Sequence, residues 1–278
     1  MEMCWIGFGE AATTFARGLA HPGRAFDLRD DNPMVAAMEA AGVRRCSSHA
    51  EAASGAALVL SLVTADQALA AAQSVAQASL GGALYFDMNS VAPDTKRAAA
   101  RTIQAAGGRY VDVAVMAPVQ PKARGVPLLV AGPHAAEGAS ALAKIGFSSV
   151  DIAGESVGDA SAVKMIRSVV VKGMEALSAE CALAADAAGV LDQVVASLDA
   201  SWQAQNWAGR FDYNLDRMMV HGTRRAAEMD EVVKTLDALG SGSVMSRATA
   251  ERQRRIGALE LAPENGLAAK LQQMRAAA

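Results

Sequence analysis

Aromatic residues and cysteines are both scarce in this sequence. Phe, Trp and Tyr make up 4% of the 278 residues, which argues against the aromatic platforms on which single-stranded nucleic acids stack. The three cysteines, Cys4, Cys46 and Cys181, lie far apart and show no metal-ligand spacing. They are therefore expected to be reduced thiols that pack as small apolar residues, and no metal site is predicted.

An excess of one charge and a long apolar run are also missing. The 26 Lys and Arg residues nearly balance the 29 Asp and Glu residues, so the formal net charge is −3. This balance favours neither a nucleic acid nor a membrane surface as a partner. No apolar run approaches the roughly 18 residues of a membrane span, and the N-terminus does not read as a signal peptide. These absences predict a soluble, cytoplasmic protein.

What the sequence does have is an alternation of apolar runs and helical patterns over residues 1–150, which is typical of a parallel sheet covered by helices. From residue 158 onward the pattern is helical, beginning with one long helix over Asp159–Ala188. The prediction is an α/β Rossmann-type dinucleotide-binding domain over 1–157, then an all-α substrate and dimerisation domain over 158–278. The elements expected in the first domain are Met3–Gly7, Arg24–Asp27, Leu58–Val63, Ala83–Asp87, Arg109–Val115 and Pro127–Ala131 as strands, and Glu10–Ala20, Pro33–Ala41, Asp66–Ala78, Pro93–Ala106 and Ala135–Ile145 as helices.

The segment Gly7–Ala12 reads G-x-G-x-x-A between a strand and a helix. Gly7 permits the tight turn, Gly9 lets a pyrophosphate approach the backbone, and the helix N-terminus offers N–H groups to the phosphates. The alternative is a glycine turn in an unrelated α/β fold. We predict a dinucleotide cofactor, with contacts from Gly7, Phe8, Gly9, Glu10, Ala11, Asp27, Val63, Thr64 and Asn89.

Asp27 follows Gly7 by 20 residues, where an acid can hold the ribose hydroxyls of the cofactor. A carboxylate there favours NAD, because it repels the 2′-phosphate of NADP. Arg29 lies close enough to accommodate that phosphate, and Asp30 or Asp31 could place the strand end later. The sequence therefore leaves NAD and NADP open, with Asp27 favouring NAD.

Three further segments carry a family resemblance: Asp87–Pro93 (DMNSVAP), Tyr110–Val115 (YVDVAV) and Gly158–Lys164 (GDASAVK). With the Gly7–Ala12 loop, they make the chain similar to the β-hydroxyacid dehydrogenases, relatives of 6-phosphogluconate dehydrogenase. The resemblance implies hydride transfer between a nicotinamide and an alcohol or carbonyl carbon. It also implies that the motif beginning at Asp87 lies beside nicotinamide and substrate, and that Lys164 is the catalytic lysine.

The chain departs from the family pattern at positions that face substrate. Met116–Pro118 (MAP) replaces the usual Ser-Gly-Gly, Ser168 stands where an asparagine is common, and Arg224–Arg225 with Glu228 lies near the position of a Lys-Asp pair. The resemblance is thus to a divergent subgroup. Imine reductases share this fold but carry an acid or a tyrosine where Lys164 stands. Lys164 favours alcohol or carbonyl chemistry, while the apolar turn keeps an imine or bulky-carbonyl reductase as an alternative.

Lys164 is suited to moving a proton at the substrate oxygen if burial lowers its pKa. On a helix it shares a face with Ser168 and Lys172, and a nearby Lys172 would lower the pKa of Lys164 further. The alternative is a lysine on a solvated helix face.

The remaining predicted substrate contacts come from both halves of the chain, and each has a structural alternative. Ser90 could instead form a turn before Pro93, and the helical set around His221 and Arg225 could form a solvated or ion-paired face. The long helix predicts a homodimer. A non-catalytic dinucleotide sensor is the alternative from another functional class. The predicted substrate contacts are Ser90, Met116, Ser168, His221 and Arg225.

Overall fold

The computed structural model describes residues 2–202, 206–240 and 242–277. The chain divides into two compact units, the first ending at Met165 and the second beginning at Ile166. In chain order, the elements are β1 (Met3–Ile6), α1 (Glu10–Ala16), β2 (Arg24–Phe26), α2 (Asn32–Ala40), β3 (Arg44–Arg45), α3 (His49–Ala53), β4 (Leu58–Ser61), η1 (Ala65–Gln67), α4 (Ala68–Val75), β5 (Leu84–Asp87), α5 (Pro93–Ala105), β6 (Arg109–Val115), η2 (Ala123–Gly125), β7 (Leu128–Ala131), α6 (Ala135–Lys144), β8 (Val150–Gly154), α7 (Asp159–Ala187), α8 (Leu191–Ser201), α9 (Trp207–Ala238), α10 (Val244–Gly257) and α11 (Leu267–Ala276).

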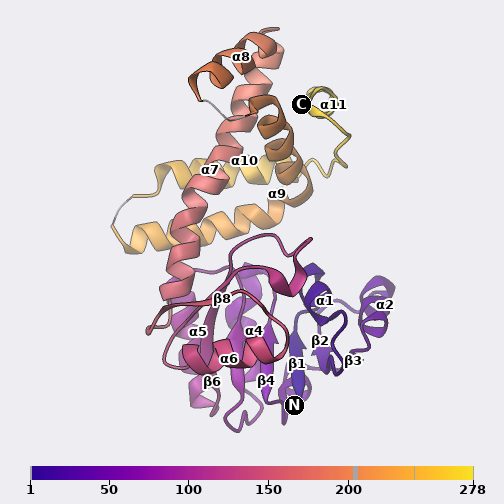
Figure 1. Cartoon of the computed structure of the whole chain (residues 1–278), viewed down its shortest axis with the longest axis vertical. Coiled ribbons are helices and arrows are strands. Elements are labelled where there is room, and N and C mark those ends of the chain that lie inside the picture. The colour runs from indigo at the N-terminus through magenta and orange to yellow at the C-terminus, as the bar shows by residue number, and fades with distance from the viewer. Residues whose placement is uncertain (1, 203–205, 241, 278) are drawn as a thin grey trace. The chain divides into compact units, whose positions relative to one another are not determined.

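The first unit is built on one eight-stranded sheet in the order β3-β2-β1-β4-β5-β6-β7-β8 (Figure 1). Neighbouring strands are parallel except for β6 and β7, which are antiparallel. The chain starts at β1, moves outward to β3 and returns beside β1 with β4. This reversal of direction makes a topological switch point, where open parallel sheets bind ligands. The predicted Rossmann-type fold class is confirmed.

Alternate residues of the central strands enter two separate cores. Trp5 of β1 and Phe86 of β5 belong to the core under α1, α2 and α6. Ile6 and Tyr85, their chain neighbours, belong to the core under α3, α4 and α5. Because successive strand residues point to opposite faces, the sheet is buried on both sides. This explains why the strands read as nearly continuous apolar runs.

Several expected boundaries were wrong. The helix expected over Glu10–Ala20 ends at Ala16, because the chain turns at Gly18, whose φ is +72°. The helix expected over Asp66–Ala78 is the short 3₁₀ turn η1 followed by α4, which ends at Val75. The two-residue strand β3 and the five-residue helix α3 were not predicted, since neither is long enough to show a periodicity.

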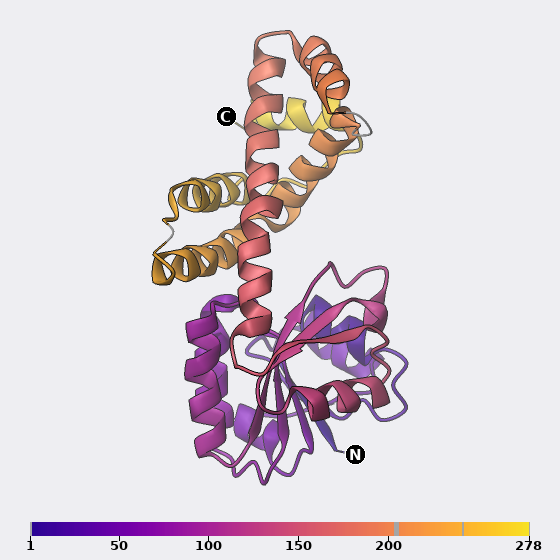
Figure 2. The ribbon, with the colours of Figure 1, turned by 60° about the vertical axis from the view of Figure 1, so that its left-hand side comes forward.

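The second unit is helical throughout its described residues. The long helix predicted over Asp159–Ala188 is confirmed as α7, which has 29 residues and can be followed as one continuous helix in Figure 2. In this unit α9 and α10 pack closely where Gly222 meets Gly257. A Cβ on Gly222 would lie 2.5 Å from the Gln253 carbonyl oxygen, and one on Gly257 would lie 2.3 Å from the Thr223 nitrogen. Only glycine permits this approach of two backbones.

Candidate cofactor and active site

The predicted cofactor residues follow four strands that end at the same edge of the sheet. Ile6 pairs in register with Phe26 on one side and with Ser61 on the other, and Ser61 pairs with Asp87. The segments that begin at Gly7, Asp27, Leu62 and Met88 therefore leave the sheet at one level. The fold brings together segments that are as much as 81 positions apart in sequence.

The two glycines of the first loop have different roles. Gly7 has φ +83°, and a Cβ there would lie 2.5 Å from the Leu62 carbonyl oxygen, so this glycine is required by the fold itself. Gly9 is the N-cap of α1 and has a negative φ of −71°. A Cβ on Gly9 would meet no described atom within 4 Å. The open space beside Gly9, at a helix N-terminus, fits the pyrophosphate of a dinucleotide.

Phe8 and Asp27 are joined across the edge. The Phe8 N–H donates to Asp27 Oδ2 at 2.7 Å, and the Arg29 N–H donates to Asp27 Oδ1 at 2.9 Å. The Phe8 ring is fully buried in the core, so only its backbone can face a cofactor. Glu10 and Ala11 form the first turn of α1 and likewise present backbone N–H groups. The Arg29 side chain is 58% exposed, with Nε 3.6 Å from Asp27 Oδ1.

Asn89 holds the loop after β4 in place. Its Oδ1 accepts from the Val63 N–H at 2.7 Å, and its Nδ2 donates to Ser61 Oγ at 3.0 Å and to Asp87 Oδ1 at 2.8 Å. Both amide hydrogens are thus engaged by the protein. Asn89 is predicted to contact the cofactor; in the structure its side chain also supports the Val63 loop. The Thr64 hydroxyl hydrogen-bonds Asp66 and, with other hydrogen bonds, lowers the pKa of that carboxyl.

Ser90 and Met116 lie at the ends of β5 and β6. The Ser90 Oγ is buried and has no hydrogen-bond partner among the described residues. Buried hydroxyls are normally paired, so this hydroxyl can take a hydrogen bond from, or give one to, a bound group. Met116 is half-buried, and its backbone N–H donates to the Pro127 carbonyl oxygen at 2.9 Å.

Lys164 lies near the start of α7, and this end of the helix is anchored to the sheet. Asp112 Oδ2, on β6, accepts from the Gly158 N–H at 3.0 Å and from the Ser161 N–H at 3.1 Å. An anion at these N–H groups is stabilised by the helix dipole. Lys164 follows Ser161 by one turn and is half-buried. The loop before α7 is held as well, because Arg97 Nη1 donates to the Val157 carbonyl oxygen at 3.3 Å.

The predicted polar residues of the second unit are largely paired with one another. Arg225 is buried and forms a two-pronged ion pair with Glu175, with Nε 3.0 Å from Oε2. Gln253 donates to the same carboxylate at 2.8 Å. Arg225 was expected to bind substrate, but its guanidinium is committed to a buried carboxylate, which is the ion-paired alternative that the sequence left open.

Ser168 and Lys172 are paired as well. The Lys172 ammonium lies 3.0 Å from Glu228 Oε2 and donates to Ser168 Oγ at 3.3 Å. The Lys172 charge is thus compensated by the Glu228 carboxylate within the second unit. His221 is half-buried on α9, four residues before Arg225.

The sequence analysis missed three buried side chains at the ends of β5 and β6: Asp87, Lys96 and Asp112. They are among the most buried charged residues of the chain. Asp87 and Asp112 both stand in the segments that carry the family resemblance, but nothing in the sequence shows that the two strands pair in that register. Lys96 reads as an ordinary polar residue of a helix.

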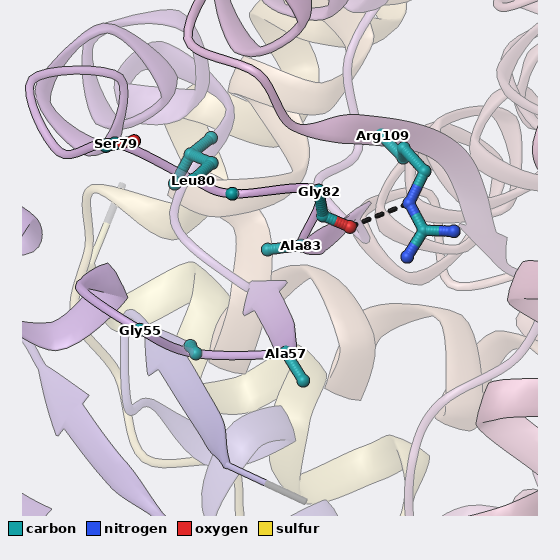
Figure 3. Close-up of a pocket in the computed structure, with 9 residues that line it drawn as sticks. Gly55, Ala57, Ser79, Leu80, Gly82, Ala83 and Arg109 are labelled. Carbon is teal, nitrogen blue, oxygen red and sulfur yellow. Dashed lines mark hydrogen bonds between the residues drawn. The ribbon is translucent and has the colours of Figure 1, made fainter.

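A pocket of about 370 Å³ opens at the opposite, amino-terminal edge of the sheet, before β4, β5 and β6 (Figure 3). Its polar side chain of note is Arg109, whose Nε donates to the Gly82 carbonyl oxygen at 2.7 Å. Because the glycine loop lies at the other edge, this pocket is not part of the predicted cofactor site. Among the described residues, His, Cys, Asp and Glu form no cluster suited to a metal ion, and no described helix is both long and apolar enough for a membrane span.

Residues 2–154 match the family model described as the NAD binding domain of 6-phosphogluconate dehydrogenase. The chain belongs to this family. Within the 6-phosphogluconate dehydrogenase-like proteins it falls in a divergent group, because residues 185–256 match a second model, a domain of unknown function named DUF1932. The family places the chain among oxidoreductases that bind a nicotinamide dinucleotide.

Several solved structures are similar to this chain. A conserved hypothetical protein from Sinorhizobium meliloti 1021 is 37% identical, covers 100% of this chain and 97% of its own, and has a TM-score of 0.74. A conserved protein of unknown function, described as structurally similar to 3-hydroxyacid dehydrogenases, is 28% identical over 92% of this chain and 96% of its own (TM-score 0.69). The Mycobacterium tuberculosis 3-hydroxyisobutyrate dehydrogenase solved with L-serine shares the fold at 17% identity (TM-score 0.75, covering 99% and 100%).

Proposed function

We propose that this protein is an NAD-dependent oxidoreductase that transfers a hydride between the nicotinamide and a small alcohol or carbonyl compound. The observation that carries the proposal is the open space beside Gly9, at the N-terminus of α1 and next to the Asp27 carboxylate. A pyrophosphate fits the helix N-terminus, and ribose hydroxyls fit the acid. Family membership supplies the reaction type.

The bound nicotinamide supplies or accepts the hydride at the substrate carbon. The chain must then handle the proton at the substrate oxygen, and we assign this to Lys164. In the reducing direction its ammonium donates a proton to the carbonyl oxygen as a C–H bond forms and the cofactor is oxidised. In the oxidising direction its neutral amine accepts the hydroxyl proton. Asp112 supports this role by fixing the turn of α7 that precedes Lys164.

Ser90 is assigned to the substrate. Its buried and unpartnered hydroxyl can donate to, or accept from, an oxygen-bearing group, and such a contact would remove the cost of an unsatisfied polar atom. The half-buried thioether of Met116 beside the exposed Ala117–Pro118 turn offers apolar contact instead of a carboxylate grip. This apolar surface also favours the second candidate, a reductase of imines or bulky carbonyls.

NAD is proposed over NADP because the Asp27 carboxylate is fixed at the edge by two backbone N–H groups. A carboxylate held there repels a 2′-phosphate. Arg29 could favour NADP, but its guanidinium forms an ion pair with the same carboxylate, and its side chain is largely exposed.

The test is a screen of alcohols, hydroxyacids, aldehydes and cyclic imines with NAD(H) and with NADP(H), followed at the nicotinamide absorbance band. Wild-type protein and Lys164→Ala are compared, and Arg101→Ala, an exposed change on α5, is the control. The proposal expects turnover of an alcohol–carbonyl pair that falls at least about a hundredfold in Lys164→Ala. Equal rates in the two proteins would refute the role of Lys164. Tight cofactor binding without turnover of any compound would favour the sensor.

A homodimer is also proposed. Four exposed apolar residues, Val163, Ile166, Val170 and Leu177, follow α7 at helical spacing, so they form one apolar stripe. Exposed stripes of this kind mark interfaces, and a helix stripe can pair with its own copy about a two-fold axis. Light scattering is expected to give twice the mass of the chain at micromolar concentration, and Val170→Glu to give the single mass. A monomeric wild type would contradict this.

A further inference from the structure

A buried ammonium group lies between two buried carboxylates in the first unit. Lys96, on α5, has 0% side-chain exposure, and its Nζ is 3.0 Å from Asp87 Oδ1 and 3.3 Å from Asp112 Oδ1. The same ammonium donates to the backbone oxygens of Asp87 and Val113. Its three protons therefore have protein acceptors on both strands β5 and β6.

The arrangement follows from strand register. Asp87 on β5 pairs with Asp112 on β6, so the two carboxylates stand side by side on the face covered by α5. Like charges in this position repel each other, and burial raises the pKa of Asp112 while Lys96 opposes that rise. The Lys96 ammonium, within 3.3 Å of both carboxylates, offsets this repulsion.

This cluster is an expensive way to stabilise a fold. Burying three charged groups carries a desolvation penalty, which a well-packed apolar core of the same volume would not have. A buried ionic group of this kind is better explained by what its members hold in place.

One side of the cluster holds the loop predicted to contact the cofactor. Asp87 Oδ1 accepts from the Asn89 backbone N–H at 3.0 Å and from its Nδ2 at 2.8 Å, and Asn89 in turn accepts from the Val63 N–H at 2.7 Å. The second carboxylate oxygen of Asp87 is fixed by the Tyr110 hydroxyl at 2.6 Å. The position of the Val63 loop is therefore set through Asp87.

The other side holds the helix that carries Lys164. Asp112 Oδ2 binds the N–H groups of Gly158 and Ser161, and an ionised carboxylate binds such donors more strongly than a neutral one. The charge on Asp112 thus fixes the first turn of α7, and Lys164 is on the next turn.

We infer that Lys96 is a positioning residue for the proposed reaction: with its ammonium between Asp87 and Asp112, it holds the two carboxylates side by side and so fixes the Val63 loop and the first turn of α7 together. This inference rests on the proposed function, because it assigns the cofactor to one of the two segments and the proton transfer to the other. Lys96 itself has no role in the chemistry. It acts through the two carboxylates.

The test follows amide hydrogen exchange by mass spectrometry in peptides that span 60–66 and 157–166, using the full-length chain. Lys96→Met removes the charge and keeps most of the volume. Ile103→Ala, a buried apolar change on the same helix, is the control for lost stability. Asp112→Asn and Asn89→Ala each break one side of the cluster. Arg101→Met, exposed on α5, is the control for a lost charge.

The expected result is that Lys96→Met speeds exchange in both peptides at least tenfold more than Ile103→Ala does. Asp112→Asn is expected to speed exchange only in 157–166, and Asn89→Ala only in 60–66. Equal effects of Lys96→Met and Ile103→Ala across the whole unit would overturn the inference, because they would show a role in stability alone. If Lys96→Met does not fold, Asp112→Asn and Asn89→Ala decide. If each of these variants speeds exchange in both peptides, the assignment of one segment to each side of the cluster is contradicted.

A second readout reports on Lys164 itself. Lysine amines are reductively methylated with ¹³C-formaldehyde and observed by NMR. The Lys164 signal is identified by its loss in Lys164→Arg. Its titration midpoint is expected to move by about half a pH unit or more in Lys96→Met and to stay unchanged in Arg101→Met. An unmoved midpoint in Lys96→Met would overturn the inference.

Neither readout needs a substrate. If no compound is turned over by the wild type, the proposed function fails whatever the exchange data show. If the wild type turns over a substrate but Lys96→Met behaves like its controls, the inference alone fails.

Discussion

The backbone N–H of Phe8 donates to the carboxylate of Asp27 at 2.7 Å, so the glycine loop and the end of β2 are fixed to each other. The same carboxylate is assigned to the cofactor ribose and to the choice of NAD over NADP. Asp27 therefore has two tasks, one within the protein and one towards the cofactor.

Replacing Asp27 is expected to weaken NADH binding more than NADPH binding. Asp27→Asn keeps an acceptor for the Phe8 N–H but loses the charge that repels a 2′-phosphate. We expect the dissociation constant for NADH to rise about tenfold, which is about 1.4 kcal/mol, and that for NADPH to fall or stay the same. Cofactor fluorescence titrations measure both constants. An unchanged ratio of the two would show that Asp27 does not face the ribose.

Gly7 and Gly9 are expected to fail in opposite ways when each is changed to alanine. At Gly7 the new Cβ would meet the Leu62 carbonyl oxygen at a positive φ, so Gly7→Ala is expected to lose about 1–3 kcal/mol of unfolding free energy. At Gly9 the Cβ has free space, so Gly9→Ala is expected to fold as well as wild type and to bind NADH at least about tenfold more weakly. Urea unfolding and cofactor titration separate the two effects. Normal cofactor binding by Gly9→Ala would show that the pyrophosphate does not bind at this loop.

The sequence predicted the fold where a local pattern carries the information. The apolar strand runs, the Gly7–Ala12 loop and the long helix that became α7 all have such patterns. The early end of α1 could not be predicted, because Gly18 turns the chain only in the context of the loop that follows. The edge strand β3 has two exposed arginines and no pattern at all.

The candidate site was predicted only in part, for a related reason. Backbone positions that follow strands could be grouped at one edge, because parallel strands end together, as the register shows. Side-chain partners depend on register, which one sequence does not show. The hydrogen bond from the Val63 N–H to the Asn89 amide is an example. The pairing of Asp87 with Asp112, and the insertion of Lys96 between them, needs the strand register to be known.

The ion pair between Arg225 and Glu175 leads to a prediction on stability. Arg225→Met leaves a buried carboxylate without its cation, which typically costs about 3–5 kcal/mol. The adjacent Arg224→Met, whose residue is about half exposed, is expected to cost under about 1 kcal/mol. Adding Glu175→Gln to Arg225→Met is expected to restore part of the loss. If Arg225→Met is as stable as wild type but binds substrate more weakly, Arg225 contacts the substrate and the stability prediction is wrong.

His49 is expected to make stability fall on mild acidification. Burial lowers the pKa of His49, and the Asp27 charge opposes this only in part. The unfolded chain then takes up a proton near its ordinary pKa of about 6.5 while the folded chain does not, so stability is full above that pH and declines as the pH falls through the lowered folded pKa. His49→Gln removes this contribution. Unfolding midpoints at several pH values between about 7.5 and 5.5 are expected to fall less in the variant than in wild type, and equal slopes would contradict the burial effect.

The proposed reaction is hydride transfer from a cofactor bound at the Gly7–Ala12 loop, with Lys164 supplying the proton. It can be followed by mass spectrometry of the product formed from NADH deuterated at its transferable position. The product made by wild type is expected to carry one deuterium on the former carbonyl carbon. Product formation is expected to be nearly abolished in Lys164→Ala and, at limiting NADH, reduced in Gly9→Ala. Product without deuterium, or formed at an unchanged rate by both variants, would contradict the proposed reaction.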